Sequence, residues 1–254
     1  MAEFDASTPS IARVYDYLLG GKDNFAADRE AAEQLLAVAP LTADVTRENR
    51  QFLARAVTWA AGQGISQFID VGCGMPTAPS THQSAREVIP DARVAYVDYD
   101  PVVLAHLHAL AAKGDPGVTV VDGDVREAGS VLDAVAAGID LAQPAVLLMG
   151  YLLHFFPPDA ARDLVARYVT ALAPGSYVVL SAGRADSDDG FGAYSSAATQ
   201  VYNHSVPTFA SFFGPLELVP PGVVDGREWR PGWEQPVHLP PREGQVIVGV
   251  ARVS

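Results

Sequence analysis

Residues 67–76 read QFIDVGCGMP, a run of β-forming residues that ends in a loop with two glycines. Phe68, Ile69 and Val71 favour a buried strand, whereas Gly72 and Gly74 permit close approaches that a Cβ atom would block. Open α/β sheets bind ligands at such loops, beyond the carboxyl end of a parallel strand. The stretch therefore predicts a nucleotide-like ligand packed against bare backbone.

The sequence around this stretch alternates strands with helices. Strands are predicted over 67–71, 93–97, 118–121, 145–149 and 176–182, and helices over 79–89, 101–113, 127–137 and 158–173. This alternation predicts an α/β fold, a mostly parallel sheet with helices on both faces. After Gly183 the rhythm changes, with helices expected near 191–203 and 207–213 and strands over 216–219 and 245–253.

The N-terminal region has a helical rather than an alternating pattern. Apolar residues recur at helical spacing from Pro9 to Ala39, and GGKDN at 20–24 interrupts them, which predicts two helices joined by a flexible elbow. A third helix is expected over 44–63. We therefore divide the chain into a helical extension or lid (1–64) and a sheet domain (65–254) with inserted helices at about 190–214.

Composition restricts the partners. The net charge of −13 over 254 residues disfavours a nucleic-acid surface, which needs Lys and Arg to neutralise phosphates. A single cysteine, Cys73, excludes an internal disulfide and a cysteine-rich zinc site, and the histidines show no metal-ligand spacing. No signal peptide or membrane span is evident. We expect a cytoplasmic protein without a metal or a membrane partner, and the sequence is compatible with a homo-oligomer.

The glycine loop departs from the dinucleotide fingerprint G-x-G-x-x-G. Thr77 occupies the third glycine position, and Pro76 and Pro79 delay the following helix, so the loop is poorly suited to a pyrophosphate. A nicotinamide-dependent oxidoreductase is therefore disfavoured. An adenosine-containing ligand without phosphate, such as S-adenosylmethionine, needs only the bare backbone.

Acidic residues follow the next two strands. Asp98 lies 24 residues beyond Gly74, and its carboxylate can accept hydrogen bonds from both ribose hydroxyls. Asp100, directly before Pro101, fits the role of helix cap, which leaves Asp98 for the ribose. Asp124 can accept from an adenine amino group, and Val125 offers an apolar face. A single acidic turn after a strand is usually a solvated loop. Here the ends of three successive strands converge on one edge of the sheet, which favours a shared binding site.

These segments, together with unusual stretches, carry a resemblance to a known family. The chain resembles the actinobacterial S-adenosyl methyltransferase family, first catalogued as a domain of unknown function, within the class I S-adenosylmethionine-dependent superfamily. The stretches that carry it are 12–25, 91–101, LLHF at 152–155 and PGSY at 174–177. The resemblance implies S-adenosylmethionine as cofactor and a Rossmann-like sheet of seven strands, the last, 244–253, inserted antiparallel.

The resemblance also implies roles for particular residues. Asp70, Gly72 and Gly74 would line the methionine and ribose portions, Asp98 the ribose, and Asp124 and Val125 the adenine. Met149 and Gly150 would lie under the sulfonium. Arg13, Tyr15 and Asn24 would contact the cofactor from the lid, with Arg13 pairing with the methionine carboxylate. For these three, the alternative is an ordinary helix–helix turn.

Methyl transfer needs close positioning of donor and acceptor, and a general base where the acceptor carries a proton. His154, just past the fourth strand, is the candidate base. The alternative is a packed histidine bonded to a backbone carbonyl. Arg227, Trp229 and Trp233 are expected in a surface loop.

The sequence thus predicts a methyltransferase for an unidentified small molecule, through O- or N-methylation. The alternative is a regulatory protein that binds S-adenosylmethionine without turnover.

Overall fold

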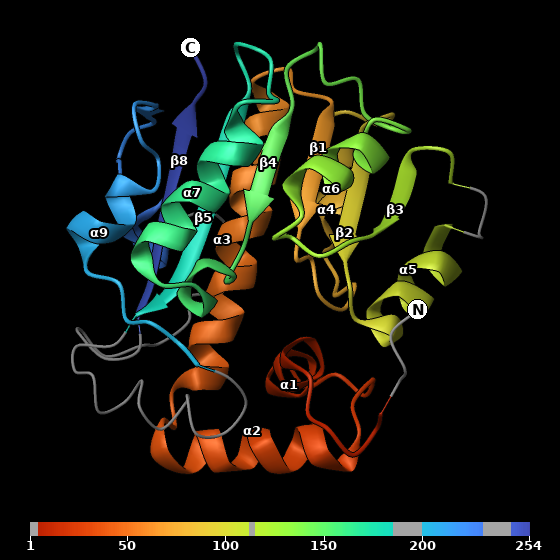
Figure 1. The fold of residues 1–254 in the computed structure, drawn as a ribbon, viewed down its shortest axis with the longest axis vertical. Coiled ribbons are helices and arrows are strands. Elements are labelled where there is room, and N and C mark those ends of the chain that lie inside the picture. Colours follow the sequence, from red (N-terminus) through yellow and green to blue (C-terminus); the bar gives the residue numbers. More distant parts are fainter. Residues whose placement is uncertain (1–4, 112–114, 185–199, 231–244) are drawn as a thin grey trace.

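The computed structural model describes residues 5–111, 115–184, 200–230 and 245–254, which fold around one central sheet (Figure 1). The strands stand in the order β3-β2-β1-β4-β5-β8-β6, and β7 pairs with β8 outside this path. Their bounds are Gln67–Val71 (β1), Arg93–Asp98 (β2), Val118–Asp122 (β3), Val146–Met149 (β4), Tyr177–Arg184 (β5), Glu217–Leu218 (β6), Val224–Asp225 (β7) and Gln245–Arg252 (β8).

The pairing confirms the predicted architecture. Strands β1 to β5 are parallel to one another, and β8 inserts antiparallel between β5 and β6. All seven predicted strands are present. The eighth, β7, is absent from the prediction because two residues are too few to show a period.

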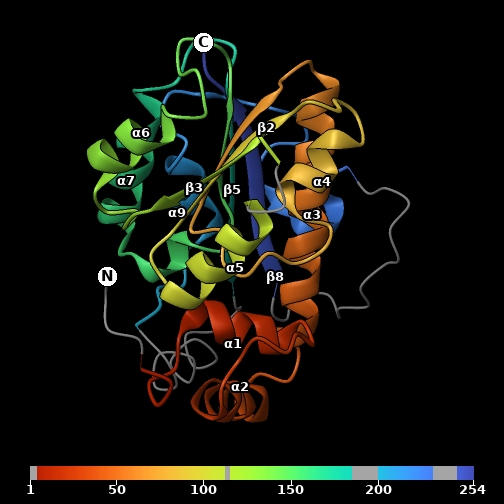
Figure 2. The ribbon, with the colours of Figure 1, turned by 90° about the vertical axis from the view of Figure 1, so that its right-hand side faces the viewer.

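Helices cover both faces of the sheet (Figure 2). One face carries α3, α4 and α5, and the other carries α6, α7 and α9. The α-helices are Ile11–Leu18 (α1), Ala26–Val38 (α2), Thr42–Gly62 (α3), Thr81–Arg86 (α4), Pro101–Ala111 (α5), Ala128–Val135 (α6), Pro158–Val169 (α7) and Val206–Ser211 (α9). Alternate residues of β4 enter opposite cores: Leu147 and Met149 pack beneath α6 and α7, whereas Val146 and Leu148 pack beneath α3.

Most predicted helices are found, with differences at their ends. The expected helix 191–203 lies largely outside the described residues, and its described end, 200–203, is not helical. The next, expected over 207–213, is α9. Within the described residues, no helix has the length and apolarity that a bilayer crossing requires.

The first two helices stand apart from the sheet. Val14 and Leu18 of α1 pack on Ala31, Ala32 and Leu35 of α2 in a small hydrophobic cluster of their own. Both helices lie beyond the carboxyl ends of the parallel strands in the two ribbon views (Figures 1 and 2). In contrast, α3 belongs to the helix layer of the sheet, because Phe52, Ala56 and Val57 enter its core. The separate part of the extension is therefore α1 and α2.

The expectation of a surface loop around Trp229 is wrong. Its side chain is fully buried and meets the rings of Phe52 and Trp59 edge to face, at 5.4 and 5.8 Å between centroids. Arg55 donates to the carbonyl oxygens of Trp229 and Gly226 and so fixes this segment on α3. The Pro- and Gly-rich composition indicated a loop, but not that its tryptophan fills the core. Trp233 lies outside the described residues.

Candidate functional site

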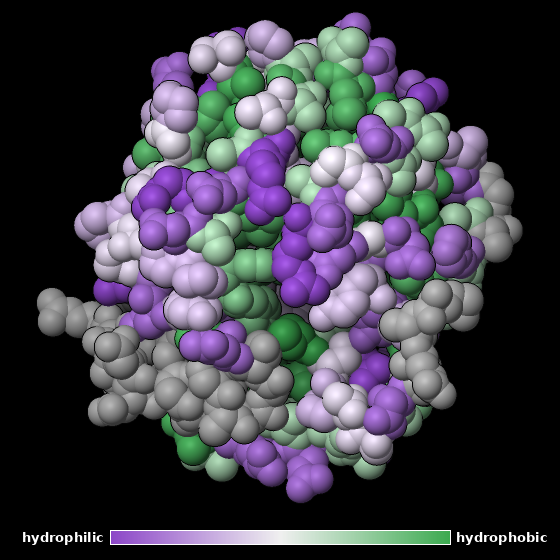
Figure 3. Space-filling model, in the orientation of Figure 1, coloured by the Kyte–Doolittle hydropathy of each residue, from purple (hydrophilic) through white to green (hydrophobic). Residues whose placement is uncertain are grey.

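A cavity of about 300 Å³ opens at the carboxyl ends of the parallel strands. The loops after β1, β2, β3 and β4 form one wall, and residues of α1 and α3 form the other. In the space-filling view, hydrophobic residues lie near the centre of the face, framed by hydrophilic ones (Figure 3). The volume is at the lower end of the range for small-molecule sites.

The glycine loop after β1 lines this cavity with backbone. Gly72 and Gly74 have positive φ angles of 66° and 65°, a region that favours glycine. A Cβ atom on Gly74 would meet no described atom within 4 Å, so the loop faces open space there. The amides of Gly72 and Cys73 both donate to the carbonyl oxygen of Val97, which joins the loop to the end of β2.

Asp98 connects the same loop to the turn after β2. One carboxylate oxygen accepts from the Gly74 amide at 2.9 Å, and the other accepts from the amides of Tyr99 and Asp100 at 2.8 and 3.0 Å. Burial raises the pKa of Asp98 above its ordinary value, against the opposing effect of these three donors. A carboxylate has about four lone-pair sites, so Asp98 retains capacity for a further donor in the cavity.

The cap role expected of Asp100 is confirmed. Its Oδ1 accepts from the amides of Val102 and Val103 at the start of α5. Its Oδ2 accepts from the Ser10 hydroxyl and lies 3.7 Å from a guanidinium nitrogen of Arg13. Asp100 therefore joins α5 to the N-terminal helices.

The remaining strand-end acids also line the cavity. Asp70 accepts from the Thr81 hydroxyl at 2.5 Å, and burial raises the pKa of its carboxyl group. Asp124 accepts from the backbone amide and side chain of Arg126, and the side-chain hydrogen bonds lower the pKa of Asp124. Val125 lies beside it and is almost fully buried.

After β4 the two predicted residues separate. The side chain of Met149 is fully buried in the core beneath α6 and α7, and Met149 is not among the described residues that line the cavity. Gly150 does line it. A Cβ atom on Gly150 would lie 2.6 Å from Cδ1 of Leu53, so a larger residue there would require the Leu53 side chain to move.

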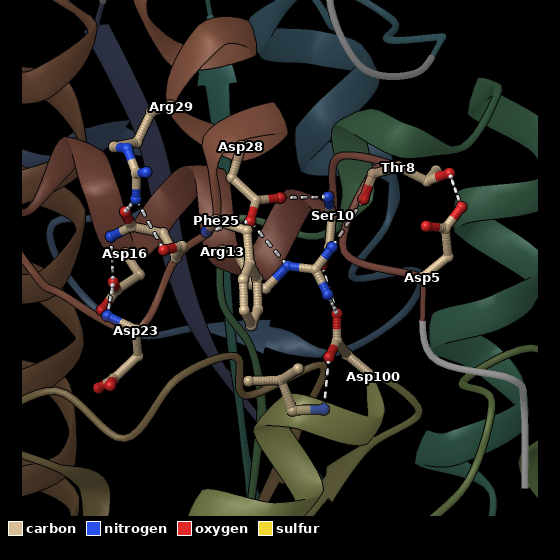
Figure 4. A network of polar contacts seen from close by, with 12 residues as sticks. Asp5, Thr8, Ser10, Arg13, Asp16, Asp23, Phe25, Asp28, Arg29 and Asp100 are labelled. Carbon is tan, nitrogen blue, oxygen red and sulfur yellow. Dashed lines mark hydrogen bonds and ion pairs between the residues drawn. The ribbon is translucent and has the colours of Figure 1, made fainter.

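Arg13 lies between Asp28 and Asp100 (Figure 4), and Asn24 lies in the elbow between α1 and α2. Arg13 is buried; it donates to Asp28 at 2.9 Å and to the Thr8 carbonyl at 2.7 Å. Asn24 donates to the Asp16 carboxylate at 2.9 Å, around which the elbow folds. Neither residue is among the described lining of the cavity, so this placement does not support contact with a ligand.

Of the three N-terminal residues expected to contact the cofactor, Tyr15 is the one that lines the cavity. Its hydroxyl donates to the Thr46 carbonyl at 3.2 Å and accepts from the Asn49 amide at 2.8 Å. Burial raises the pKa of Tyr15, so its hydroxyl stays protonated near neutral pH.

His154 lies behind the cavity wall, within the 3-10 helix η1 (Leu153–Phe155). Its ring is 2% exposed, and its Nδ1 accepts from the Gly183 amide at 3.4 Å. Burial lowers the pKa of His154 to about 3, far below what a base needs near neutral pH. This geometry favours a packed histidine over a general base.

Sequence reasoning missed several of the lining residues, among them Asn49, Arg50 and Tyr151. Asn49 and Arg50 belong to α3, and Tyr151 follows Gly150 with a φ of 56°. The side chain of Arg50 donates to the carbonyl oxygens of Thr77 and Pro79, at 3.0 and 3.2 Å, in the loop beyond Gly74. No local motif marks these positions. For Asn49 and Arg50, the available signal was that two adjacent polar residues stand on a helix that carries apolar residues toward the core.

The fold and this cavity together define a class of protein. The sheet order and the acids at three successive strand ends are those of an α/β domain that binds an adenosine-containing cofactor over a glycine loop. Among the described residues no group of three or more His, Cys, Asp or Glu could hold a metal ion.

The sequence profile of the S-adenosyl methyltransferase family matches residues 1–254. The chain therefore belongs to the S-adenosyl methyltransferase family, a family of enzymes that use S-adenosylmethionine as cofactor.

Two solved structures match nearly the whole chain. A candidate methyltransferase from Thermobifida fusca YX is 40% identical, with a TM-score of 0.91, over 98% of this chain and 96% of that one. A DUF574 family protein from Streptomyces avermitilis MA-4680 is 32% identical, with a TM-score of 0.92, over 98% and 99% of the two chains.

A more distant relative is the carboxy-S-adenosyl-L-methionine synthase of Chromohalobacter salexigens. It is 27% identical over 115 residues, which are 44% of this chain and 38% of that protein. The match thus spans less than half the length of this curated relative.

The residues present fit S-adenosylmethionine. The Gly72–Gly74 backbone leaves the space that a ligand without phosphate requires, and Asp98 has capacity for a ribose donor. When bound, the cofactor supplies an electrophilic methyl group on a sulfonium.

We predict that Asp98→Ala weakens the binding of S-adenosylhomocysteine by about 1.5 to 3 kcal/mol, because charged hydrogen bonds to the ribose are lost. Asp122→Ala is the control: Asp122 pairs in register with Asp98 at the end of β3 and is exposed. It should leave the affinity unchanged. Titration calorimetry measures both, and equal affinities for Asp98→Ala and the parent chain would place the ribose elsewhere.

A second prediction concerns His154 and the pH dependence of stability. The imidazole protonates near its ordinary pKa of 6.5 in the unfolded chain but only near 3 in the folded one, so between these values the unfolded state binds more protons. The contribution of this group to stability is complete above pH 6.5 and declines as the pH falls below it.

Relative to His154→Gln, the parent chain should therefore lose up to about 1.4 kcal/mol more unfolding free energy per pH unit between pH 6 and 4. Urea unfolding at pH 4, 5 and 6 measures the difference, in which groups common to both chains cancel. Parallel curves would show that His154 titrates normally.

Proposed function

We propose that this protein transfers the methyl group of S-adenosylmethionine to a small-molecule acceptor, by O- or N-methylation. The observation that carries the proposal is the shared cavity, which strand-end acids and bare glycine backbone line together with Tyr15 of α1 and the aromatic residues of the β4 loop. Methyl transfer from a sulfonium is an in-line displacement, so holding donor and acceptor together supplies most of the catalysis.

We assign the two ends of the cofactor from the strand order. Asp124 and Val125 follow β3, Asp98 ends β2, and Asp70 and Gly72 lie at the end of β1, in that order across the sheet. This order supports adenine at β3, ribose at β2 and methionine at β1. The end of β4, with Gly150, is then the next position, where the methyl group would meet its acceptor.

We assign the methionine carboxylate to Arg50 rather than to Arg13. Arg50 and Arg126 are the cationic side chains in the described lining, and Arg126 is bonded to Asp124 at the adenine end. The two carbonyl contacts of Arg50 orient its guanidinium without neutralising it, and no carboxylate lies within ion-pair distance of it among the described residues. A guanidinium in this state suits a carboxylate ligand.

We further propose that α1 and α2 act as a lid on this cavity. Ser10, Ile11, Ala12 and Tyr15 contribute to the lining, and the helices have a hydrophobic cluster separate from the sheet. The contacts of Asp100 with Ser10 and Arg13 would hold the lid beside the ribose loop. This narrows the proposed lid from residues 1–64 to the part before α3.

The overall proposal predicts binding of S-adenosylhomocysteine and methyl transfer from labelled S-adenosylmethionine into the small-molecule fraction of a cell extract. Calorimetry with the homocysteine product and with NAD, followed by counting of the separated fractions, measures both. Binding of NAD alone would overturn the cofactor assignment, and label in macromolecules would overturn the acceptor class. Binding without any transfer would favour the regulatory alternative.

The carboxylate assignment predicts a selective effect of Arg50→Met. The affinity for S-adenosylhomocysteine should fall by about 1.5 to 3 kcal/mol, because an ionic hydrogen bond is lost. The affinity for 5′-methylthioadenosine, which lacks the amino-acid part, should not change. Arg126→Met, at the adenine end, is the control and should affect both compounds alike. Equal losses for the two compounds in Arg50→Met would contradict the assignment.

A further inference from the structure

Tyr151 has a backbone conformation that side-chain-bearing residues rarely adopt. Its φ is 56°, and Arg230 is the other non-glycine residue with a positive φ in the described part of the chain. For a bulky aromatic residue this region is unusual, and such outliers persist only where the surrounding structure enforces them. The residue lies directly after β4 and lines the cavity.

Strand β5 enforces this conformation. The Tyr151 amide donates to both the hydroxyl and the carbonyl oxygen of Ser181, at 2.9 and 3.1 Å. The ring extends over Gly183, where a Cβ atom would lie 2.9 Å from the Tyr151 hydroxyl. Ser181 thus fixes the backbone, and Gly183 leaves room for the ring.

Asn49 links this arrangement to a second tyrosine. Its side-chain oxygen accepts from the Ser181 hydroxyl at 2.6 Å, and its side-chain nitrogen donates to the Tyr15 hydroxyl at 2.8 Å. Asn49 is 1% exposed, so these bonds are shielded from water. One buried amide therefore sets the positions of both Tyr15 and Tyr151, which come from distant parts of the chain.

The two rings face the same part of the cavity. Their centroids are 5.6 Å apart and their planes are tilted by 52°. Leu53, Leu152, Phe155 and Phe156 complete the lining nearby. This end lies beyond the acids of β1 to β3, and it offers an apolar, aromatic surface.

We propose that the adjoining rings of Tyr15 and Tyr151 form one aromatic surface on which a planar aromatic acceptor packs at the end of β4, with Tyr151 determining the preference for planar compounds. This inference rests on the proposed function, because it places the acceptor beside the methionine end of the cofactor. Flat aromatic molecules gain from stacked or edge-to-face contact with such rings beyond the effect of burial alone. Saturated rings of similar size cannot make the same contacts.

The test compares 2-naphthol with decahydro-2-naphthol, which has the same carbon framework and hydroxyl group but is not planar. Binding of each to the full chain is measured by equilibrium dialysis in saturating S-adenosylhomocysteine. The parent chain should prefer 2-naphthol by about tenfold. Tyr151→Leu should remove this preference, whereas Tyr151→Phe, which keeps the ring, should retain it.

Two controls separate a specific role from a structural one. Affinity for S-adenosylhomocysteine should be unchanged in both Tyr151 variants, and Tyr17→Leu, which alters a tyrosine of α1 outside the described lining, should keep the preference. If Tyr151→Leu does not fold, Gly183→Ala displaces the ring from β5 and should also reduce the preference.

The outcomes distinguish the two proposals. If the parent chain binds S-adenosylhomocysteine but shows no preference between the two alcohols, the proposed aromatic surface alone is overturned. A preference that survives Tyr151→Leu has the same consequence. A parent chain that does not bind S-adenosylhomocysteine overturns the proposed function, and with it the proposed role of the Tyr15 and Tyr151 surface.

Discussion

The buried carboxylate of Asp98 is the constraint on which the cavity depends. It accepts three backbone amides, one from the glycine loop after β1 and two from the turn after β2. Without it, the amides of Gly74, Tyr99 and Asp100 would lose a shared acceptor, and the buried Asp100 amide would be left without this partner, which is unfavourable. The group proposed to bind the ribose therefore also builds the loop on which the cofactor would rest.

The two walls of the cavity are joined through the same turn. The amide of Asp100 binds Asp98, while its carboxylate caps α5 and contacts Ser10 and Arg13 of the N-terminal region. Arg13 is consequently a residue that holds α1 in place, not one that faces a ligand. These contacts connect the turn that carries Asp98 to the N-terminal helices proposed as a lid.

The glycine loop and the acids at the strand ends could be predicted from sequence, whereas Arg50 on α3 and Tyr151 in the β4 loop could not. Gly74, Asp98 and Asp124 directly follow β-forming runs, and parallel strands bring their carboxyl ends together. Arg50 and Tyr151 carry no such signal, because the facing side of α3 and the backbone of the β4 loop are set by contacts with β5 and the 77–79 segment. The same limit explains His154: position after a strand does not say which way a side chain turns.

The sequence by itself determined the α/β order and the acids at the sheet edge, since strand and helix periods are local properties of the chain. The antiparallel direction of the last strand followed only from the resemblance to the family. Only the tertiary structure decided which arginine lies in the cavity, that Trp229 fills the core, and that Asn49 connects Tyr15 to Tyr151 through Ser181. Each of these depends on packing between segments far apart in sequence, and no local pattern encodes it.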